Sequence, residues 1–329
     1  MKKRAPRNRT LTCTESELKS LSADLLRLTE PTSSESLTDR IVNQDLEEAL
    51  PFLPPGFVDL LILDPPYNLT KNYNGHVFRS RQASDYIYWF GRILTDILPL
   101  LRPNASLYVC SDWKTSNLVF PVLDKHLHVR NRITWEREKG RGAKTNWKNN
   151  TEDIWFCTVG DEYCFNVDDV KIKRRVIAPY RSEDGKPKDW EESQNGNCRL
   201  TYPSNLWSDI TIPFWSMQEN TDHPTQKPEK LIAKLILASS NPGDFVFDPF
   251  FGSGTTAVVA RKLNRRFCGI ELNQEYCCWA AKRLIQAGND KSIQGYADGV
   301  FWERNSLNDQ KTRKDAKKPC GESLELFNE

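Results

Sequence analysis

A short motif early in the chain combines a carboxylate, a rigid backbone carbonyl and an aromatic ring. It is Asp64-Pro65-Pro66-Tyr67, and it directly follows the apolar run Val58 to Leu63. Proline restricts its own backbone and keeps the preceding residue extended, so the Asp64 carboxylate and the Pro65 carbonyl are two fixed acceptors. Together they can accept hydrogen bonds from both N–H groups of a planar amine and localise its lone pair, while Tyr67 offers a stacking face. The motif indicates chemistry at an amino group on an aromatic ring.

A glycine turn later in the chain has the composition of a cofactor loop. The run Asp248-Pro249-Phe250-Phe251-Gly252-Ser253-Gly254-Thr255 directly follows apolar residues 245–247. Glycine lets the backbone turn tightly near a ligand, and a helix that begins near Thr255 would point its amino terminus at the same place. A Gly-x-Gly turn alone is a weak signal, and the early motif alone is also compatible with a strand that ends in a proline turn.

The residues around this turn narrow the kind of cofactor. Neither the third glycine of a dinucleotide fingerprint nor the Gly-Lys-Ser/Thr run of a phosphate loop follows Gly254. Glu271 ends the next expected strand, where an acidic side chain can accept both hydroxyls of a ribose. S-adenosyl-L-methionine has a ribose and no phosphate cluster. The two motifs together therefore suggest methyl transfer to an amino group on a base.

The elements that must position these motifs form an α/β pattern. Both motifs follow short apolar runs, which are typical of buried parallel strands with loops at their carboxyl ends. Alternating strands and helices predict a mostly parallel, Rossmann-like sheet with helices on both faces. Further strands are expected at 105–110, 129–135, 153–159 and 267–270, and helices at 85–101, 114–125, 255–263 and 274–286, with one more around 231–238.

Composition divides the chain into five segments. Residues 1–40 form a basic, polar arm with one short amphipathic stretch, and residues 41–160 and 223–290 carry the catalytic and cofactor halves of the sheet pattern. Residues 161–222 are polar and rich in charge, Pro and Asn, with isolated aromatic residues, and we expect an irregular insertion for target recognition, since long loop-rich insertions are usually functional or disordered. Residues 291–329 are a polar tail that we expect to be partly mobile.

Basic residues are clustered rather than spread along the chain. The net charge is only +2, but positive residues collect at the amino terminus, between Arg130 and Lys148, and in the run 171–175. Aromatic residues lie between the basic ones in the last two regions, as on nucleic-acid-binding surfaces. The candidates for contact with a polyanion in the insertion are Lys171, Lys173, Arg174, Arg175 and Arg181.

Composition also argues against several other classes of protein. Of the 329 residues, 38% are apolar and 27% charged, and no apolar run approaches the roughly 20 residues of a membrane helix. The basic amino terminus is not followed by the apolar stretch of a secretory signal. The nine cysteines include no Cys-x-x-Cys pair, so we expect neither a zinc site nor disulfides. These features predict a soluble cytoplasmic protein with reduced thiols and no metal.

The motifs and their order resemble those of the DNA amino-methyltransferases of the β group, in which the catalytic motif precedes the target-recognition region and the cofactor motif comes last. Asp64 to Tyr67 resembles the catalytic motif and Asp248 to Gly254 the cofactor motif. The run His223-Pro224-Thr225-Gln226-Lys227-Pro228 is similar to the stretch associated with the methionine end of the cofactor. Asn43-Gln44-Asp45-Leu46 resembles a segment that contacts the cofactor adenine, with Gln44 in place of the usual glycine. The resemblance spans roughly residues 41–285.

This resemblance implies an S-adenosyl-L-methionine-dependent enzyme that acts on a base flipped out of double-stranded DNA. The catalytic residues would be Asp64, Pro65, Pro66 and Tyr67. The implied cofactor-binding residues come from four separate segments: Asp45, Leu46, His223, Thr225, Lys227, Asp248, Phe250, Gly252, Ser253, Gly254, Thr255 and Glu271.

Several alternatives remain open at this level. Aspartate at the head of the motif favours N6 of adenine in this family, yet N4 of cytosine presents the same N–C=N arrangement. Methylation of a protein glutamine, where related folds use Asn-Pro-Pro-Tyr, and an inactive DNA-binding relative are less favoured. A histidine base is disfavoured for His76 and His223, since no paired carboxylate is evident. A partner restriction endonuclease and the choice between monomer and homodimer are also open.

Overall fold

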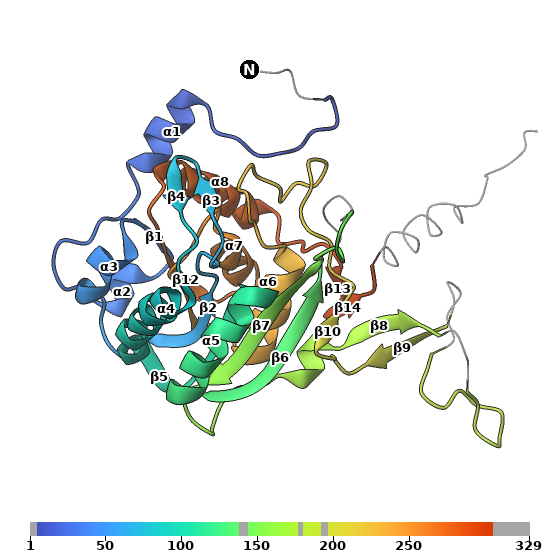
Figure 1. Cartoon of the computed structure of the whole chain (residues 1–329). Coiled ribbons are helices and arrows are strands. Elements are labelled where there is room, and N and C mark those ends of the chain that lie inside the picture. Colours follow the sequence, from blue (N-terminus) through green and yellow to red (C-terminus); the bar gives the residue numbers. More distant parts are fainter. Residues whose placement is uncertain (1–4, 138–143, 177–179, 192–196, 305–329) are drawn as a thin grey trace, which may run out of the picture.

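The computed structural model describes residues 5–137, 144–176, 180–191 and 197–304, and its centre is an eight-stranded sheet (Figure 1). The strand order is β1-β12-β11-β2-β5-β7-β6-β10. Within this sheet only β7 is reversed, because it pairs antiparallel with both β5 and β6. The strands are β1 (Arg40–Asn43), β2 (Val58–Leu63), β5 (Leu101–Asp112), β6 (His128–Glu136), β7 (Thr151–Thr158), β10 (Leu206–Trp207), β11 (Phe245–Asp248) and β12 (Arg266–Glu271).

Helices cover both faces of this sheet. One face packs against α3 (Leu46–Ala49), α4 (Ala83–Ile97) and α5 (Trp113–His126), and the other against α6 (Glu229–Ser239), α7 (Thr255–Lys262) and α8 (Gln274–Asn289). In β2, Leu61 and Leu63 belong to the first core, whereas Leu60 and Ile62 belong to the second. Burial on both faces explains the nearly continuous apolar run of this strand. The predicted α/β fold with a mostly parallel sheet is confirmed.

The expected helix over 85–101 was wrong at its carboxyl end. α4 ends at Ile97, a 3₁₀ turn follows at Leu98–Leu100, and Leu101 already begins β5. Pro99 has no amide to donate, and it lies in the first turn of the 3₁₀ segment, where no intrahelical donor is needed, so the α-helix ends before it. The sequence patterns also missed the hairpin of β3 (Lys71–Tyr73) and β4 (His76–Phe78), whose strands are too short to show a period.

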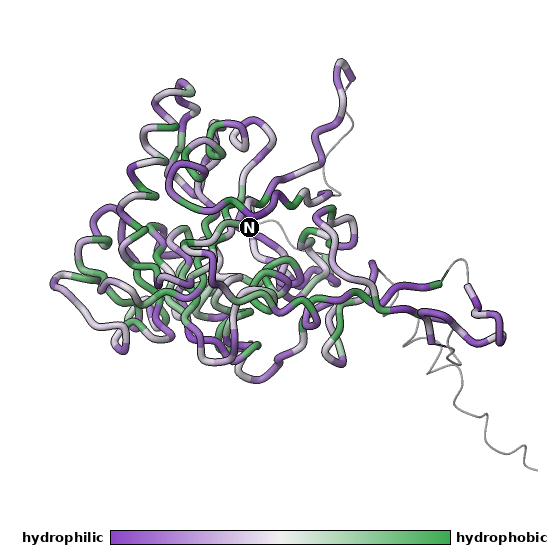
Figure 2. The backbone as a smooth tube through the Cα atoms, turned by 90° about the horizontal axis from the view of Figure 1, so that it is seen from below, coloured by the Kyte–Doolittle hydropathy of each residue, from purple (hydrophilic) through white to green (hydrophobic). Residues whose placement is uncertain are grey.

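The insertion and the tail contain regular structure that the sequence did not predict. β8 (Ile172–Arg175) and β9 (Cys198–Thr201) form an antiparallel pair, and β14 (Val300–Trp302) adds parallel to β8, with β13 (Tyr296–Ala297) beside it. This small sheet joins segments that are far apart in the chain, so no local sequence pattern predicts it. β8 and β9 extend away from the α/β body, and Figure 2 shows that this projection is largely hydrophilic. Residues 305–329 of the tail lie outside the described part of the chain.

The amino-terminal segment contains a short helix within its amphipathic stretch and also contributes to the core. α1 (Glu15–Ser22) begins at a capping box formed by Thr14 and Glu17, and α2 (Ser34–Leu37) follows it. Leu28 and Leu37 are buried in the same core as α4, so packed structure begins before residue 41. No helix in the described residues is long and apolar enough to cross a membrane.

Candidate active site

The two sequence motifs meet at one edge of the central sheet. Asp64 follows β2, Asp248 ends β11 and Glu271 ends β12, and these three strands are adjacent and parallel. On the far side of β12, β1 leads into Asp45 at the start of α3. Since parallel strands place their carboxyl ends together, the motifs converge although the chain separates them widely.

A cavity of about 690 Å³ lies at this edge and holds residues from both motifs. A larger cavity of about 1230 Å³, bordered by the amino-terminal segment and α8, contains none of the predicted site residues. Five predicted cofactor residues do not line the smaller cavity: Lys227, Asp248, Ser253, Gly254 and Thr255. The other predicted residues of the catalytic and cofactor sets do line it: Asp45, Leu46, Asp64, Pro65, Pro66, Tyr67, His223, Thr225, Phe250, Gly252 and Glu271.

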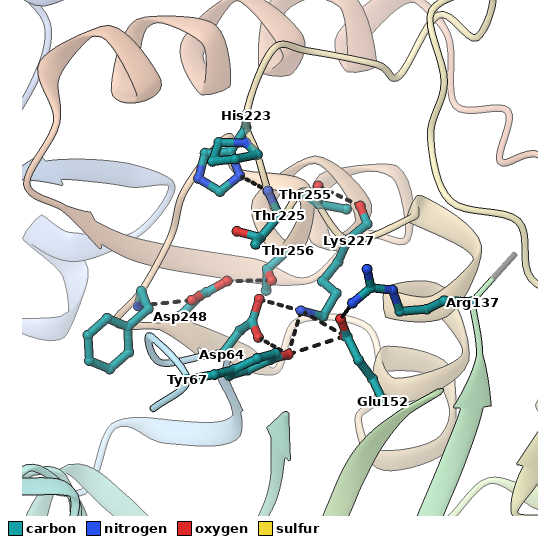
Figure 3. Close-up of polar contacts among 12 residues, drawn as sticks. Asp64, Tyr67, Arg137, Glu152, His223, Thr225, Lys227, Asp248, Thr255 and Thr256 are labelled. Carbon is teal, nitrogen blue, oxygen red and sulfur yellow. Dashed lines mark hydrogen bonds and ion pairs between the residues drawn. The ribbon is translucent and has the colours of Figure 1, made fainter. Parts of the chain in front are cut away.

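A buried charge cluster holds the catalytic motif (Figure 3). The Lys227 ammonium donates to Asp64 Oδ2 at 2.6 Å and to the Tyr67 hydroxyl at 3.1 Å. The Tyr67 hydroxyl lies 3.0 Å from Asp64 Oδ1 and 3.2 Å from Glu152 Oε2. Glu152 Oε2 is also 3.4 Å from the Lys227 nitrogen, and its other oxygen accepts from Arg137. Lys227, predicted at the methionine end of a cofactor, thus contacts the Asp64 carboxylate and does not line the cavity.

Burial and charge set the protonation states in this cluster. Burial would lower the pKa of Lys227, but the Asp64 and Glu152 carboxylates outweigh it and raise that pKa. Burial would raise the pKa of Glu152, yet Lys227 and Arg137 hold it below its usual value. Burial and the two carboxylates raise the pKa of Tyr67 well above its usual value. At neutral pH the cluster therefore contains an ammonium, an ionised Glu152 and a neutral phenol.

The Glu271 carboxylate lies at the other end of the cavity and ties two loops together. Its Oε2 accepts from the Gly252 amide and its Oε1 from the Asn273 amide, each at 2.8 Å. Burial raises the pKa of Glu271, and these amides partly oppose that rise. A carboxylate oxygen has two lone pairs, so both oxygens retain capacity for a ligand hydroxyl. This arrangement fits the ribose of an adenosine-containing cofactor.

At two positions of the later motif, any residue other than glycine would be disfavoured. Gly252 has a φ of +52°, and a Cβ there would lie 3.0 Å from the His223 ring. Gly254 has a φ of +74°, and its Cβ would lie 2.5 Å from the Cβ of Ala280 in α8. Left-handed backbone and the absence of space both require glycine. The turn can therefore approach both the His223 ring and α8 closely.

The remaining residues of that motif hold the shape of the turn. Asp248 accepts from the Thr256 hydroxyl at 2.6 Å and from the Phe250 amide at 3.1 Å. Burial raises the pKa of Asp248 to about 7, against the effect of the Thr256 bond and with that of the Asp64 charge. On the other side, buried Arg283 donates to the Ser253 carbonyl at 2.8 Å and to the Thr255 hydroxyl at 2.9 Å. These contacts lie within the protein rather than in the cavity.

The early segment that resembles an adenine-contacting stretch serves two purposes in the structure. Asp45 caps α3 by accepting from the Glu47 amide at 2.8 Å, and both Asp45 and Leu46 line the cavity. The buried Gln44 side chain accepts from the Leu28 amide at 2.9 Å. The departure from glycine at this position therefore fastens the amino-terminal segment to the sheet without displacing Asp45 from the cavity.

His223 is held as a neutral ring at the cavity wall. It lies edge-on to Tyr276 with ring centroids 4.5 Å apart, and its Nδ1 accepts from the Thr225 amide at 3.4 Å. Burial, aided by the nearby Lys227 and Lys71 charges, lowers the pKa of His223 to about 3. An imidazole this hard to protonate is a poor proton acceptor at physiological pH.

Sequence reasoning missed Glu152 and Arg137. The strand was expected to begin at Asp153, which left Glu152 in a loop, and Arg137 was counted among a surface basic stretch. Because β7 is reversed, its first residues lie at the same sheet edge as the ends of the parallel strands, and Glu152 pairs in register with Trp135 near the end of β6. The position of Glu152 near the motifs follows only from the direction in which β7 pairs with its neighbours. Lys139 and Arg141 of the same basic stretch lie outside the described residues.

The basic residues singled out in the insertion lie on or next to the projecting sheet. Lys171 pairs with Asp168 at 2.6 Å, Lys173 lies over the Trp302 ring and Arg174 lies 3.6 Å from Glu303. Arg175 and Arg181 are exposed, and Arg181 stacks on Trp190 with its guanidinium carbon 5.0 Å from the ring centroid. None of these five lines the motif cavity. These basic residues therefore lie apart from the motif cavity.

Comparisons with known proteins agree with this geometry. Residues 58–282 match the DNA methylase family of N6- and N4-amino methyltransferases. The chain is 33% identical over 269 residues to the DNA adenine methyltransferase YhdJ of Escherichia coli (strain K12), covering 79% of this chain and 87% of that protein. It is 32% identical over 251 residues to the type II methyltransferase M.HpaI of Haemophilus parainfluenzae, covering 75% and 74%.

Solved structures support the fold assignment. The M1.HpyAVI–SAM complex superposes with a TM-score of 0.51 at 24% identity and covers 74% of this chain and 98% of that one. The cytosine-N4-specific PvuII DNA methyltransferase gives a TM-score of 0.55 at 17% identity, with 76% and 90% covered. With the family match over residues 58–282, the chain belongs to the S-adenosyl-L-methionine-dependent DNA amino-methyltransferases.

Proposed function

We propose that the protein methylates N6 of adenine in double-stranded DNA, within a short target sequence. The observation that carries this proposal is Asp64, which lies on the wall of the cavity that also holds Gly252 and Glu271. Aspartate heads the catalytic motif, and the relative named above as an adenine methyltransferase is 33% identical. Both support adenine over cytosine.

The proposed cofactor site comprises residues from four segments of the chain. Glu271 would accept hydrogen bonds from the ribose hydroxyls, Asp45, Leu46 and Phe250 would surround the adenine, and Gly252, His223 and Thr225 would lie toward the methionine end. Bound S-adenosyl-L-methionine supplies an electrophilic methyl group on a sulfonium centre. Asp248, Ser253, Gly254 and Thr255 support this site from behind, through the contacts with Thr256 and Arg283.

The catalytic residues act on the amino nitrogen of the target base. The Asp64 carboxylate and the Pro65 carbonyl accept hydrogen bonds from its two N–H groups, which localises the lone pair on nitrogen. The Tyr67 ring stacks on the flipped base, and such stacking contributes about 1–3 kcal/mol against the few kcal/mol that flipping costs. Pro66 keeps Pro65 extended, so that its carbonyl stays aimed at the base.

Product analysis tests this function directly. Purified protein is incubated with S-adenosyl-L-methionine and mixed-sequence duplex DNA, and the DNA is digested and its nucleosides weighed. N6-methyladenine is the expected product. N4-methylcytosine would overturn the adenine assignment, and methyl groups found in protein but not in DNA would overturn the proposal as a whole.

The projecting sheet is the proposed target-recognition surface. Replacing Lys173 and Arg175 by glutamine should weaken DNA binding and reduce the slope of log affinity against log salt by about one for each phosphate that the variant no longer neutralises. Cofactor affinity should not change, because neither residue lines the cavity. Fluorescence anisotropy with labelled duplex measures the DNA affinity and its salt slope, and Lys125→Gln on α5 serves as the control for loss of charge. Unchanged DNA affinity and salt slope would contradict this assignment.

A further inference from the structure

A buried carboxylate and a largely buried one share one ammonium in this protein. Lys227 Nζ lies 2.6 Å from Asp64 Oδ2 and 3.4 Å from Glu152 Oε2, and the side chains of Lys227, Asp64 and Glu152 are 8%, 19% and 6% exposed. Asp64 belongs to the catalytic motif, whereas Glu152 comes from β7 and belongs to neither motif. Both carboxylates line the motif cavity. Glu152 is therefore placed where it can influence the catalytic carboxylate.

The Tyr67 hydroxyl is shared in the same way. It lies 3.0 Å from Asp64 Oδ1 and 3.2 Å from Glu152 Oε2, but it has one proton and can donate to one carboxylate at a time. Asp64 and Glu152 thus both contact the same two donors, the Lys227 ammonium and the Tyr67 hydroxyl. If Glu152 lost its charge, both donors would turn to Asp64 and occupy its acceptor positions more fully.

Arg137 keeps Glu152 in this place. Arg137 directly follows β6, and its guanidinium donates to Glu152 Oε1, the oxygen that faces neither Lys227 nor Tyr67. Both oxygens of Glu152 thereby have partners, and the carboxylates of Asp64 and Glu152 are compensated by the cations of Lys227 and Arg137. A buried ion needs such compensation, because an unpaired buried charge is strongly destabilising. Arg137 itself is 37% exposed, so it can lose its partner at smaller cost than Lys227.

We propose that Glu152, fixed by Arg137, is a positioning residue for methyl transfer: by sharing Lys227 and Tyr67 it leaves Asp64 free to accept from the target amine. This inference rests on the proposed role of Asp64. Glu152 does not touch the reacting atoms. It acts on the rate through Asp64 and the orientation of the Tyr67 ring.

Glu152→Gln, which keeps the shape and removes the charge, tests the proposal. The single-turnover rate at saturating DNA and cofactor should fall by about 10- to 100-fold, as for loss of one preorganised electrostatic interaction. The dissociation constant for S-adenosyl-L-methionine and the KM for DNA should stay within about twofold. Glu136→Gln on β6, the same chemical change at a nearby strand end outside the cavity, should keep the wild-type rate. A rate for Glu152→Gln within about twofold of wild type would overturn the proposal.

A double-mutant cycle with Arg137→Gln separates positioning from a general loss of structure. If Arg137 acts through Glu152, its replacement should lower the rate about tenfold in wild type and less than about twofold in Glu152→Gln. Additive losses would refute the inference. Should Glu152→Gln fail to fold, Arg137→Gln decides: a tenfold loss at unchanged cofactor affinity supports the proposal, and a wild-type rate overturns it. Failure of the proposed function itself is distinguishable, because wild-type protein would then produce no methylated base.

Discussion

Replacing Asp64 with alanine should abolish methyl transfer and leave cofactor binding intact. The Asp64 oxygens contact Lys227 and Tyr67, whereas the Glu271 oxygens, which we assign to the ribose, contact Gly252 and Asn273. Loss of Asp64 removes the acceptor that localises the lone pair of the amine. Since removal of one preorganised electrostatic group costs about 10²–10³ in rate and this one also orients the nucleophile, we expect a loss of at least about a thousandfold.

Calorimetry with S-adenosyl-L-methionine and transfer of labelled methyl groups to DNA measure the two effects separately. Asp64→Asn is the matched control for shape, because it keeps an acceptor oxygen and loses the charge that pairs with Lys227; it should also be severely impaired. A cofactor affinity that collapses in Asp64→Ala would place this side chain in the cofactor site rather than at the amine.

Replacing Lys227 with methionine should have the largest effect on stability. Lys227 is 8% exposed and is the ammonium shared by Asp64 and Glu152. Without it, Asp64 loses its ion pair, and Glu152 retains the Arg137 guanidinium and the neutral Tyr67 hydroxyl as partners. Breaking a buried ion pair by removal of one partner costs about 3–5 kcal/mol, so we expect a loss of this size at neutral pH together with loss of methyl transfer. Urea unfolding measures the stability, and Lys125→Met on α5 is the control.

The loss of stability in Lys227→Met should depend on pH, and its sign follows from Glu152. Burial opposes ionisation of Glu152, but Lys227 and Arg137 hold its folded pKa below the usual 4.5. A carboxylate with a lowered folded pKa stabilises the protein above its unfolded pKa, and that stabilisation is lost as pH falls through the folded value. The difference between wild type and variant should therefore shrink below about pH 4.5. A difference that is constant from pH 7 to pH 4 would show that the charge of Glu152 is not involved.

Much of the fold followed from local patterns. The apolar run before Asp64 and the one before Asp248 predicted buried parallel strands, and both strands were found with their motifs at the carboxyl ends. Gly252 and Gly254 predicted a tight turn, and both have positive φ. Errors came where local pattern was overridden or absent: Pro99 shortened α4, and the strands of the projecting sheet were too short to show a period.

The division between sequence and tertiary structure is clearest around Tyr67. The motifs Asp64 to Tyr67 and Asp248 to Gly254 are contiguous, and each carries its chemistry in neighbouring residues, so the sequence alone was enough to indicate an amino-methyltransferase with a nucleoside-type cofactor. The partners of these motifs are not contiguous. Lys227 contacts Asp64 directly, Glu152 contacts Lys227 and Tyr67, and Arg137 contacts Glu152. These residues come from distant parts of the chain, and Glu152 lies here because β7 is antiparallel to its neighbours. Strand direction depends on pairing between distant segments, and the local pattern of apolar and polar residues does not predict it.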